Sequence, residues 1–487
     1  MKFNTGIKML LVSSYPSREC GLATFSNDIV NAVANVFGDT LPIEVCALEN
    51  EGQQFEYSDE VKYTLSTSNI DDYRLVAEKI NERNDIGLVC IQHEFGLFGG
   101  EFGDYILSFI LALNKPIVTV FHTVLPNPDQ KRQKVVHAIA DLSDRIVVLT
   151  KNSQNILTSD YEVTPSKILV IPHGNHTVLW EQKEKLKTDF NFSDRIVMST
   201  FGLISENKGI ETVLYALPEI VSSYPEVVYL VIGKTHPEIL RREGEKYRDF
   251  LIDIVKRQNL ENNVIFVNEY LELKELLDYL TLSDIYLFSS KDPNQAVSGT
   301  FAYAMSCGCA VISTPIPHAK ESLHNENGIL LNGFDQSEEF QEAIFRLIEN
   351  TETRVGMGKN AFATSSSTSW KNIAIQYRLL FDQLTNREDD LKFNFPPIKF
   401  DHIKNLTTDQ GILQFSKFSQ PDPESGYTLD DNARALINMV LYNKVYPDEN
   451  CLKLANTYLS FIEGIQEKDG WFNNYKDFNG QLDRKST

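Results

Sequence analysis

Small polar residues open the stretch SGTFAYAMSCGCAVIS, which runs from residue 298 to residue 313. Ser298 is a favourable helix N-cap, and the backbone N–H groups of Gly299 and Thr300 would then lack partners within the helix. Such donors, together with the helix dipole, bind phosphate, and a glycine leaves room for the phosphate to approach. An ordinary capped helix has the same triplet, so the surrounding sequence must decide between the two interpretations.

A second group of chemically useful residues follows other apolar runs in the same half of the chain. Lys208 comes after the strand-like MSTFGL and its Gly202, where a lysine would neutralise a phosphate. The segment GKTHPEILRR adds His236, Arg241 and Arg242 after the next apolar run. Lone basic residues in such places are usually solvated, so this group also needs support from its context.

Histidines lie at the ends of several apolar runs in the first half. His122 ends PIVTVFH, His93 and Glu94 follow GLVCIQ, and His173 ends KILVIPH. Because the carboxyl ends of parallel strands meet at one edge of a sheet, we expect these side chains to face the same cleft. A histidine at a strand end is also often structural, and both interpretations stay open for each position.

A framework of parallel strands is needed to bring these residues together. Runs rich in Val, Ile and Leu alternate with helix-length amphipathic segments, which is typical of parallel sheets covered on both faces. The runs lie at 8–14, 43–48, 87–92, 116–122, 145–150 and 167–174, and they restart at 195–205, 227–234, 264–270, 284–290, 309–314 and 328–333. The predicted fold class is α/β, with two facing Rossmann-like doubly wound domains followed by an all-α region.

The expected domain boundaries lie where these patterns change. We expect one Rossmann-like domain over residues 1–175 and a second over 176–368, followed by a helix at 369–385 that packs back on the first domain. The charged, proline-bearing stretch 386–400 is typical of a linker. Residues 401–487 contain two helix patterns, too few to close a core, which indicates a partial and truncated α-helical domain.

Composition restricts the partners. The formal net charge of −21 at pH 7 argues against nucleic acid, although a local cluster of cations can still hold a small anion. The six cysteines are scattered and form no CxxC pair, which favours reduced thiols in a cytoplasmic protein. No apolar run is long enough to span a bilayer and the start lacks a signal-peptide pattern, so we expect no stable membrane insertion.

The longest motifs carry a family resemblance. They are FGLISENKGIETVLYALPEI (201–220), IPHG (171–174) and AMSCGCAVISTPIPHAKESLHNENGILL (304–331). On these motifs the chain resembles the retaining glycosyltransferases of family 4, which have the GT-B fold, over roughly residues 8–384. With YPSRECGLATF (15–25) and QHEFGLFGG (92–100), it is similar to a subgroup that carries an appended C-terminal α-helical domain of a carbohydrate-active type.

The resemblance implies a nucleotide-diphospho-sugar donor on the second domain and a carbohydrate or glycoside acceptor on the first. It assigns the amides of Gly299 and Thr300 and the ammonium of Lys208 to the leaving diphosphate. Glu321 matches a glutamate that binds ribose hydroxyls or holds its loop, and His122 matches a position near the transferred sugar. His122, Lys208 and Glu321 form the implied catalytic set. The remaining implied residues are Gly21, Gly202, His236, Arg241, Arg242 and Ser298 toward the donor, and His93, Glu94 and His173 toward the acceptor or sugar.

Three positions depart from the family pattern. The family has two glutamates separated by seven residues, whereas this chain has Gln295 and Tyr303 as donor-side residues, which hydrogen-bond hydroxyls but carry no charge. Leu203 stands where the family tends to have an arginine, so Arg241 or Arg242 is the expected replacement cation. These departures leave open which nucleotide base and which sugar the donor carries, and which leaving group departs.

The resemblance implies a transfer without a metal or another cofactor, since no acidic DxD pair follows a strand. The protein would stabilise the leaving diphosphate electrostatically, and that phosphate would accept the acceptor's proton on the same face. A GT-B-type phosphorylase that uses phosphate or a sugar 1-phosphate and a non-catalytic sugar- or nucleotide-binding protein stay open as alternatives. The stretch ESGYTLDDNARALI (424–437) also resembles the start of an (α/α) toroid with Glu424, Asp430 and Asp431 as candidates, although helix N-terminal charge explains the acid pair more simply.

Overall fold

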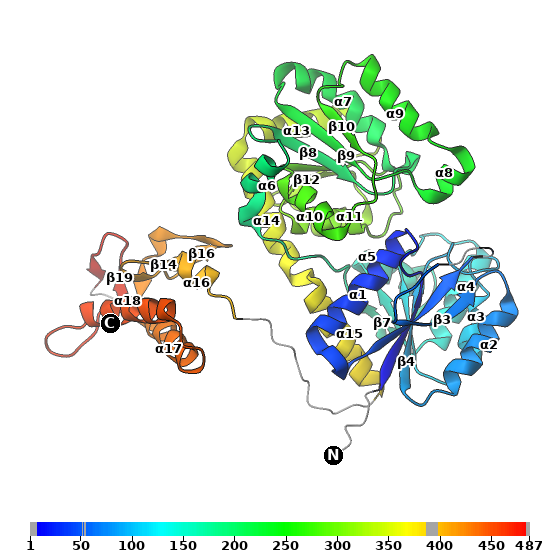
Figure 1. Cartoon of the computed structure of the whole chain (residues 1–487), viewed down its shortest axis with the longest axis horizontal. Helices are drawn as coiled ribbons and strands as arrows, with labels where there is room; N and C mark the ends of the chain where they lie inside the picture. The colour runs from blue at the N-terminus through cyan, green and yellow to red at the C-terminus, as the bar shows by residue number, and fades with distance from the viewer. Residues whose placement is uncertain (1–6, 51, 53–54, 386–397, 484–487) are drawn as a thin grey trace. The chain divides into compact units, whose positions relative to one another are not determined.

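The computed structural model describes residues 7–50, 52, 55–385 and 398–483 of the 487-residue chain. The chain divides into two compact units, residues 1–394 and 395–487. The first unit contains two sheets of seven and six parallel strands (Figure 1). Most of the expected linker, residues 386–397, lies outside the described residues.

The first sheet has the strand order β3-β2-β1-β4-β5-β6-β7. Its strands are β1 (Lys8–Ser13), β2 (Ile43–Glu49), β3 (Val61–Ser66), β4 (Ile86–His93), β5 (Ile117–Phe121), β6 (Arg145–Val148) and β7 (Ile168–Val170). Its helices are α1 (Gly21–Phe37), α2 (Ile70–Asn81), α3 (Ile106–Ala112), α4 (Gln130–Leu142), α5 (Lys151–Ser159) and the distant α15 (Trp370–Thr385). Leu10 and Val12 of β1 pack with α2–α5, whereas Met9 and Leu11 pack with α1 and α15. The near-continuous apolar strands are thus buried on both faces, and we call this layer the first domain.

The second sheet has the order β10-β9-β8-β11-β12-β13. Its strands are β8 (Ile196–Phe201), β9 (Val227–Ile232), β10 (Val264–Val267), β11 (Ile285–Phe288), β12 (Ala310–Ser313) and β13 (Gly328–Leu330). Its helices are α6 (Lys183–Asp189), α7 (Ile210–Ser223), α8 (Pro237–Glu243), α9 (Lys246–Arg257), α10 (Leu273–Leu282), α11 (Gly299–Ser306), α12 (Pro317–Ser322), α13 (Ser337–Glu349) and α14 (Thr351–Ser365). Met198 packs with α7, α9 and α13, while Val197 faces α6 and α10 on the other side. We call this layer the second domain.

Each sheet has one point at which the strand order reverses. The reversal lies between β1 and β4 in the first domain and between β8 and β11 in the second. Ligands of open parallel sheets bind outside the carboxyl ends of the strands at such a point. In the second domain, these ends lead into the loop of Gly202 and Lys208 and into the loop before Ser298.

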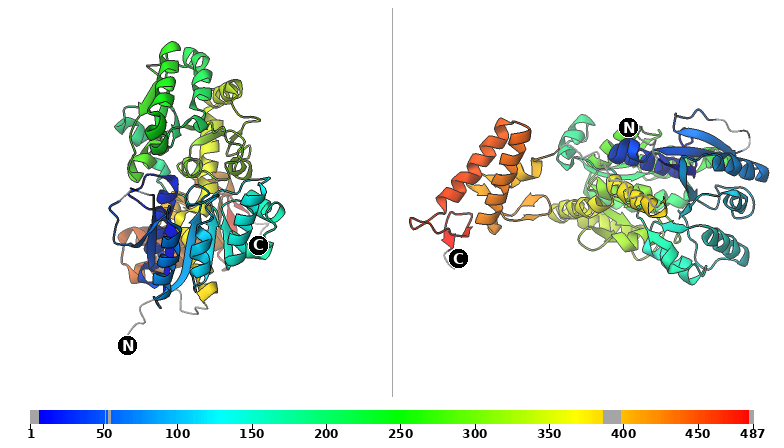
Figure 2. Two further views of the ribbon diagram at one scale, coloured as in Figure 1. Left: turned by 90° about the vertical axis from the view of Figure 1, so that its right-hand side faces the viewer. Right: turned by 90° about the horizontal axis from the view of Figure 1, so that it is seen from below.

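The chain returns to the first domain through α15. Trp370, Tyr377 and Phe381 of this helix are buried against α1 and the first sheet. Asn175 anchors the crossing, because its carbonyl accepts a 2.9 Å hydrogen bond from Trp370 N–H and its side-chain amide donates to the Ser365 carbonyl at 2.7 Å. Figures 1 and 2 show α15 alongside α1.

The second unit is built mainly from α16 (Asp401–Leu406), α17 (Leu429–Val445) and α18 (Glu449–Gly464). Two-residue strands between and after these helices add short antiparallel ladders. Met439 and Tyr458 lie at the centre of its core, which shows that α17 packs on α18. No helix in the described part of either unit is long and apolar enough to cross a membrane.

Candidate functional site

Two glycines let the loops after β8 and β9 approach each other. Gly202 and Gly233 have φ angles of +143° and +123°, and a Cβ on Gly233 would collide with the Gly202 carbonyl. This approach therefore requires glycine. A Cβ on Gly202 would lie 3.4 Å from Lys208 Nζ and 3.5 Å from Thr300 Cγ2. The predicted phosphate lysine and the predicted helix start consequently lie side by side.

Lys208 is the last residue of the 3₁₀ turn η4 (Glu206–Lys208). Its carbonyl accepts a 2.7 Å hydrogen bond from Ser289 Oγ, which fixes this turn to the loop after β11. Within the described residues its ammonium has no carboxylate oxygen within 4.0 Å, and burial lowers the pKa of Lys208. The nearby Lys291 differs, because it pairs with Glu211 at 2.7 Å and Asp335 at 3.0 Å. An unpaired, partly buried cation is suited to receive an anionic ligand.

The first backbone N–H groups of α11 are free to bind a ligand. Ser298 is the N-cap predicted from the sequence, and its Oγ accepts a 3.3 Å hydrogen bond from Phe301 N–H. The Ser298 N–H itself donates to His318 Nδ1 at 3.1 Å. In the described part of the chain, the N–H groups of Gly299 and Thr300 have no hydrogen-bond partner. Two adjacent donors at a helix N-terminus thus face the same region as Lys208.

The two residues that replace family glutamates have structural partners. Gln295 accepts a 2.7 Å hydrogen bond from Ser290 Oγ and thereby ties the loop before α11 to the end of β11. The Tyr303 hydroxyl donates to Asp28 Oδ2 on α1 at 2.5 Å, with His176 Nε2 at 3.2 Å. Tyr303 therefore joins the two domains through its hydroxyl, and its predicted contact with the donor stays a prediction.

Three histidines gather around the start of α11. His173 follows β7, and its Nε2 would lie 3.0 Å from a Cβ on Gly299. His122 follows β5, and His318 lies on α12 with its Nδ1 at the Ser298 N–H; the charge of His173 contributes to the lowered pKa of both histidines. Burial is the main cause that lowers the pKa of His122 and His318 to about 3, so both are neutral near pH 7. The rings of His122 and His173 both pack against Phe25, and their predicted position in one cleft stays a prediction.

His93 is a backbone neighbour of His122, but its ring is turned into the core, and its predicted role toward the acceptor is wrong. Its ring is fully buried among Phe95, Phe98 and Phe121, and neither ring nitrogen has a hydrogen-bond partner in the described structure. Burial lowers the pKa of His93 to about 3. The side chain points into the core because β4 alternates its residues between the two faces of the sheet.

Glu94 and Gly21 lie on the loops that follow β4 and β1. Glu94 accepts hydrogen bonds from Thr123 Oγ1 at 2.7 Å and Phe95 N–H at 3.0 Å, and burial raises the pKa of its carboxyl group. Gly21 is the first residue of α1, and a Cβ there would meet nothing within 4 Å. The predictions of Gly21 toward the donor and of Glu94 toward the acceptor or sugar stay untested by these contacts.

Glu321 makes a contact that the sequence did not indicate. Its carboxylate accepts hydrogen bonds from the first backbone N–H groups of α5, at 3.0 Å from Lys151 and 2.5 Å from Asn152. It lies near the end of α12. Glu321 therefore caps a helix of the first domain from the second domain.

The loop after β9 contains the other predicted basic residues. His236 caps α8; burial lowers its pKa, Glu238 raises it, and the Lys208 ammonium lowers it slightly. Arg241 and Arg242 are exposed in the last turn of α8, and Arg242 pairs with Glu243 at 3.1 Å. No described contact brings either arginine to Lys208. The prediction that one of them supplies the missing cation therefore has no support in these contacts.

Several residues of this region were missed from the sequence. Asp28, His176 and His318 were not among the candidates selected from the sequence. Arg248 was also missed, and its Nη2 donates a 2.9 Å hydrogen bond to the Gly233 carbonyl. The motif STPIPHAKE contained His318, and the segment GNHT contained His176, so a search for every histidine beside a strand end would have found both.

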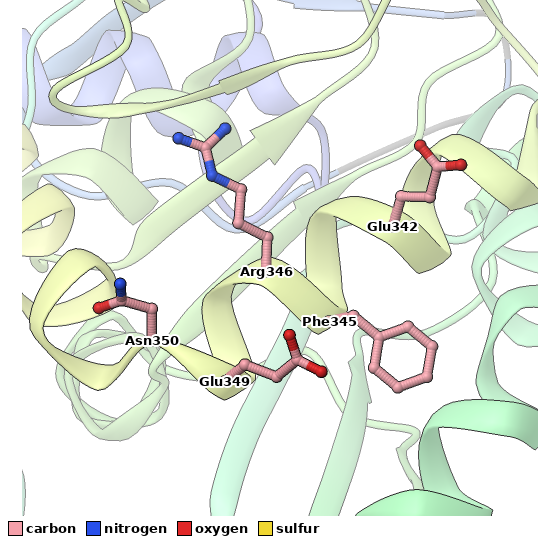
Figure 3. Close-up of a pocket in the computed structure, with 5 residues that line it drawn as sticks. All are labelled: Glu342, Phe345, Arg346, Glu349 and Asn350. Atoms are coloured by element: carbon pink, nitrogen blue, oxygen red, sulfur yellow. The ribbon is translucent and has the colours of Figure 1, made fainter.

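A shallow depression elsewhere on the second domain is lined by Glu342, Phe345, Arg346, Glu349 and Asn350 (Figure 3). These residues come from α13 and its C-terminal cap, and none follows the carboxyl end of a strand. The described residues also contain no group of three or more His, Cys, Asp or Glu placed to hold a metal ion. The loops around α11 remain the candidate site.

Comparison with solved structures identifies the fold of the first unit. HepE from Anabaena, solved in complex with UDP, is 17% identical, and the match covers 77% of this chain and all of that chain with a TM-score of 0.61. Sucrose-phosphate synthase from Thermosynechococcus elongatus is 16% identical over 78% of this chain and 99% of that chain, with a TM-score of 0.63. Together with the two parallel sheets, these matches establish the predicted GT-B fold.

Sequence comparison adds relatives and a family match. An uncharacterized glycosyltransferase, MJ1069 of Methanocaldococcus jannaschii, is 26% identical over 248 residues, which are 50% of this chain and 59% of that protein. The chain spans about half the length of the curated relatives it matches. Residues 182–364 match the family described as Glycosyl transferases group 1. The domain that holds Lys208 and α11 is thus the part of this GT-B chain that is similar to the group 1 glycosyl transferases.

Proposed function

We propose that the chain is a retaining, metal-independent glycosyltransferase that moves a hexosyl group from a nucleotide-diphospho-sugar to a carbohydrate or glycoside acceptor. The observation that carries this proposal is the unpaired Lys208 ammonium beside the open amides of Gly299 and Thr300. A diphosphate provides the negative charge that such a group of donors selects. The match to the group 1 family and the UDP in the HepE structure support a nucleotide-sugar as its source.

The same donors would assist departure of the nucleotide. Charge grows on the diphosphate as the glycosidic bond breaks, and the positioned amides and Lys208 stabilise that charge without reorganising. Partial burial strengthens these interactions relative to water. The leaving phosphate would take the acceptor's proton on the face from which the nucleotide departs, so the anomeric configuration is retained.

The surrounding residues supply positioning. His122 would contact the transferred sugar through its free ring nitrogen, since Gln92 Oε1 occupies the other one at 2.7 Å. Gly202 and His236 border the diphosphate, and Glu94 faces the acceptor from the loop after β4. These roles raise the effective concentration of the two substrates and need no covalent intermediate.

A thermal-shift titration tests the donor assignment. Wild type and Lys208→Ala are titrated with UDP, GDP and ADP, their common sugar conjugates, and hexose 1-phosphates. We expect one nucleotide to stabilise the wild type and to lose most of this effect in Lys208→Ala. Lys246→Ala, an exposed lysine at the start of α9, is the matched control and should respond as the wild type does.

Turnover then distinguishes the reaction types. With the responding nucleotide-sugar and a panel of glycosides, proton NMR of the product should show the donor's anomeric configuration, and EDTA should leave the rate unchanged. Release of a sugar 1-phosphate with inorganic phosphate, without any nucleotide response, would indicate a phosphorylase. Inversion at the anomeric carbon or loss of activity in EDTA would contradict the mechanism proposed above.

A further inference from the structure

The tautomer of His173 follows from its hydrogen bond. Its Nδ1 lies 2.7 Å from the carbonyl oxygen of Gly174, and a carbonyl oxygen only accepts. Nδ1 therefore carries a proton. In the neutral ring the other nitrogen, Nε2, then has a lone pair and no proton.

The Nε2 atom of His173 lies close to the start of α11. His173 Nε2 would lie 3.0 Å from a Cβ on Gly299, the residue that opens the helix. Among the described residues Nε2 has no hydrogen-bond partner, and it does not belong to the fully buried unpaired atoms. An anion bound to the amides of Gly299 and Thr300 would thus place its electron-rich oxygen atoms beside the unprotonated Nε2 of His173.

The other two histidines differ from His173 in this respect. His318 accepts the Ser298 N–H through Nδ1, so its Nε2 carries a proton and donates while the ring is neutral. His122 faces Gln92 Oε1 through Nε2, and the Gln92 amide nitrogen is directed at Cys90 Sγ, 3.5 Å away. His122 therefore carries its proton on Nε2, and the free Nδ1 suits a sugar hydroxyl.

We propose that His173 takes up one proton on Nε2 when the diphosphate of the donor binds at the start of α11, so that donor binding is coupled to pH. The proton comes from the solvent, and the imidazolium then donates Nδ1–H to Gly174 and Nε2–H to a phosphate oxygen. No covalent bond other than N–H forms. This inference rests on the proposed function, because it requires an anionic donor at these amides.

The groups around His173 decide the direction of the effect. Burial lowers the pKa of His173 most, the hydrogen bond to the Gly174 carbonyl and the charge of Asp28 on α1 raise it, and His176 lowers it. The His122, His318 and Tyr303 side chains also face this cluster and are neutral near pH 7. Without the donor the ring is therefore neutral at a pH where an exposed histidine would begin to charge. A bound phosphate favours the charged ring and raises its pKa.

The consequence is a defined pH window for affinity. Between the pKa of His173 in the free protein and its higher pKa in the complex, donor affinity falls tenfold for each unit of rising pH. Above the second value the affinity is constant with respect to His173. Within the window each bound donor carries one proton into the site.

Isothermal titration calorimetry in buffers of different ionisation enthalpy measures this proton. The titrant is the nucleotide-sugar that stabilises the wild type, because its diester diphosphate does not titrate near neutral pH, unlike the terminal phosphate of a free nucleotide. For the wild type we expect the observed enthalpy, plotted against the buffer ionisation enthalpy, to show uptake that approaches one proton at some pH between 5 and 8. An absence of uptake throughout that range would overturn the inference without any variant.

Two variants test whether His173 is the group that takes up the proton. His173→Asn keeps an N–H donor that does not titrate, so it should bind the donor with no proton uptake and with a flat pH profile. His318→Asn is the matched control, and it should bind more weakly while still taking up the proton. Uptake that persists in His173→Asn would overturn the assignment. Failure of every nucleotide-sugar to bind would overturn the proposed function as well, whereas binding without uptake would overturn this inference alone.

Discussion

The Tyr303 hydroxyl on α11 donates a 2.5 Å hydrogen bond to the Asp28 carboxylate on α1, and this bond ties the donor-side helix to the first domain. His176 Nε2 lies 3.2 Å from Asp28 Oδ2 and from the Tyr303 oxygen. Asp28 is only 5% exposed, so these hydrogen-bond partners compensate for its lost hydration. Tyr303 stands where the resemblance places a glutamate, and Asp28 brings a carboxylate to this position from the other domain.

Tyr303→Phe should therefore destabilise the first unit. The substitution removes one donor from a buried carboxylate, and we expect a loss of about 1–3 kcal/mol. Asp28→Asn should cost a similar amount, and the double variant should cost less than the sum because the two residues share one interaction. Thermal unfolding of the full chain measures these effects. Tyr215→Phe, at an exposed tyrosine on α7, is the control, and equal additive losses would show that Tyr303 and Asp28 are not coupled.

Acid should destabilise the protein through its buried histidines. Burial lowers the pKa of His93 to about 3 from 6.5. A depressed pKa means that the folded state binds fewer protons than the unfolded state, so the stability is complete above pH 6.5 and is lost as the pH falls toward 3. Each such histidine costs about 2 kcal/mol by pH 5.

His93→Met isolates one of these contributions. It removes two unpaired ring nitrogens from an apolar cluster, so the variant should be at least as stable as the wild type at pH 7.5. Between pH 7.5 and pH 5 it should lose about 2 kcal/mol less than the wild type in denaturant unfolding. Phe98→Met, an apolar substitution in the same cluster, should leave the pH dependence unchanged. Parallel pH profiles for wild type and His93→Met would contradict the assignment.

Gly299→Ala should separate ligand binding from folding. Alanine is a better helix former than glycine, and its Cβ would lie 3.0 Å from His173 Nε2, so the expected change in stability is below about 1 kcal/mol. The same Cβ occupies space beside the open amides, and donor affinity should fall at least about tenfold, or about 1.4 kcal/mol. Calorimetric titration of the donor and thermal unfolding measure the two effects.

The matched control for this substitution is Gly356→Ala on α14. A Cβ there meets nothing within 4 Å, so helix propensity should stabilise the variant by about 0.5–1 kcal/mol while donor affinity stays unchanged. Unchanged affinity in Gly299→Ala as well would show that the amides of α11 do not receive the donor.

Glu321→Gln should expose the first amides of α5. The Glu321 carboxylate accepts hydrogen bonds from the N–H groups of Lys151 and Asn152, and loss of its charge weakens the cap by about 0.5–1 kcal/mol. Hydrogen exchange at these two amides should accelerate, whereas Lys320→Gln, next in the chain, should leave it unchanged. Because the resemblance assigns the same carboxylate to ribose, saturating donor should also accelerate exchange in the wild type. Equal protection in wild type and Glu321→Gln would show that the cap is absent in solution.

The sequence predicted the framework of the site better than the roles of single residues. Val, Ile and Leu runs determine the two buried parallel sheets, and chain order then places Lys208 and Ser298 beside the reversal between β8 and β11. His93 was assigned wrongly because a strand end does not show which face the last side chain takes. The partners of Tyr303 and Glu321 were not predictable, since Asp28 and Lys151 lie 275 and 170 residues away and only the packing of the two domains brings them together.

Deprotonation of the Lys208 ammonium should lower donor affinity at alkaline pH, in addition to the decline set by His173. Burial lowers the pKa of Lys208 from 10.5, so the free protein loses this charge at a lower pH than an exposed lysine does. The charged form binds the diphosphate, and affinity should therefore fall with rising pH from a point below 10.5. Lys208→Ala should bind the donor about 10- to 150-fold more weakly at pH 7.5, because it removes a charge-assisted hydrogen bond of about 1.5–3 kcal/mol.

Lys208→Arg distinguishes this limit from the one set by His173. A guanidinium stays charged throughout the accessible range, so the variant should retain part of the affinity and lose the alkaline decline. Lys208→Arg should keep the decline in donor affinity at lower pH that is set by His173. His173→Asn should lack that decline. Calorimetric titrations of the three proteins from pH 5 to pH 10 measure both limits. An alkaline decline of equal size in Lys208→Arg would mean that another group titrates, and Lys208 would then not be the cation that holds the diphosphate.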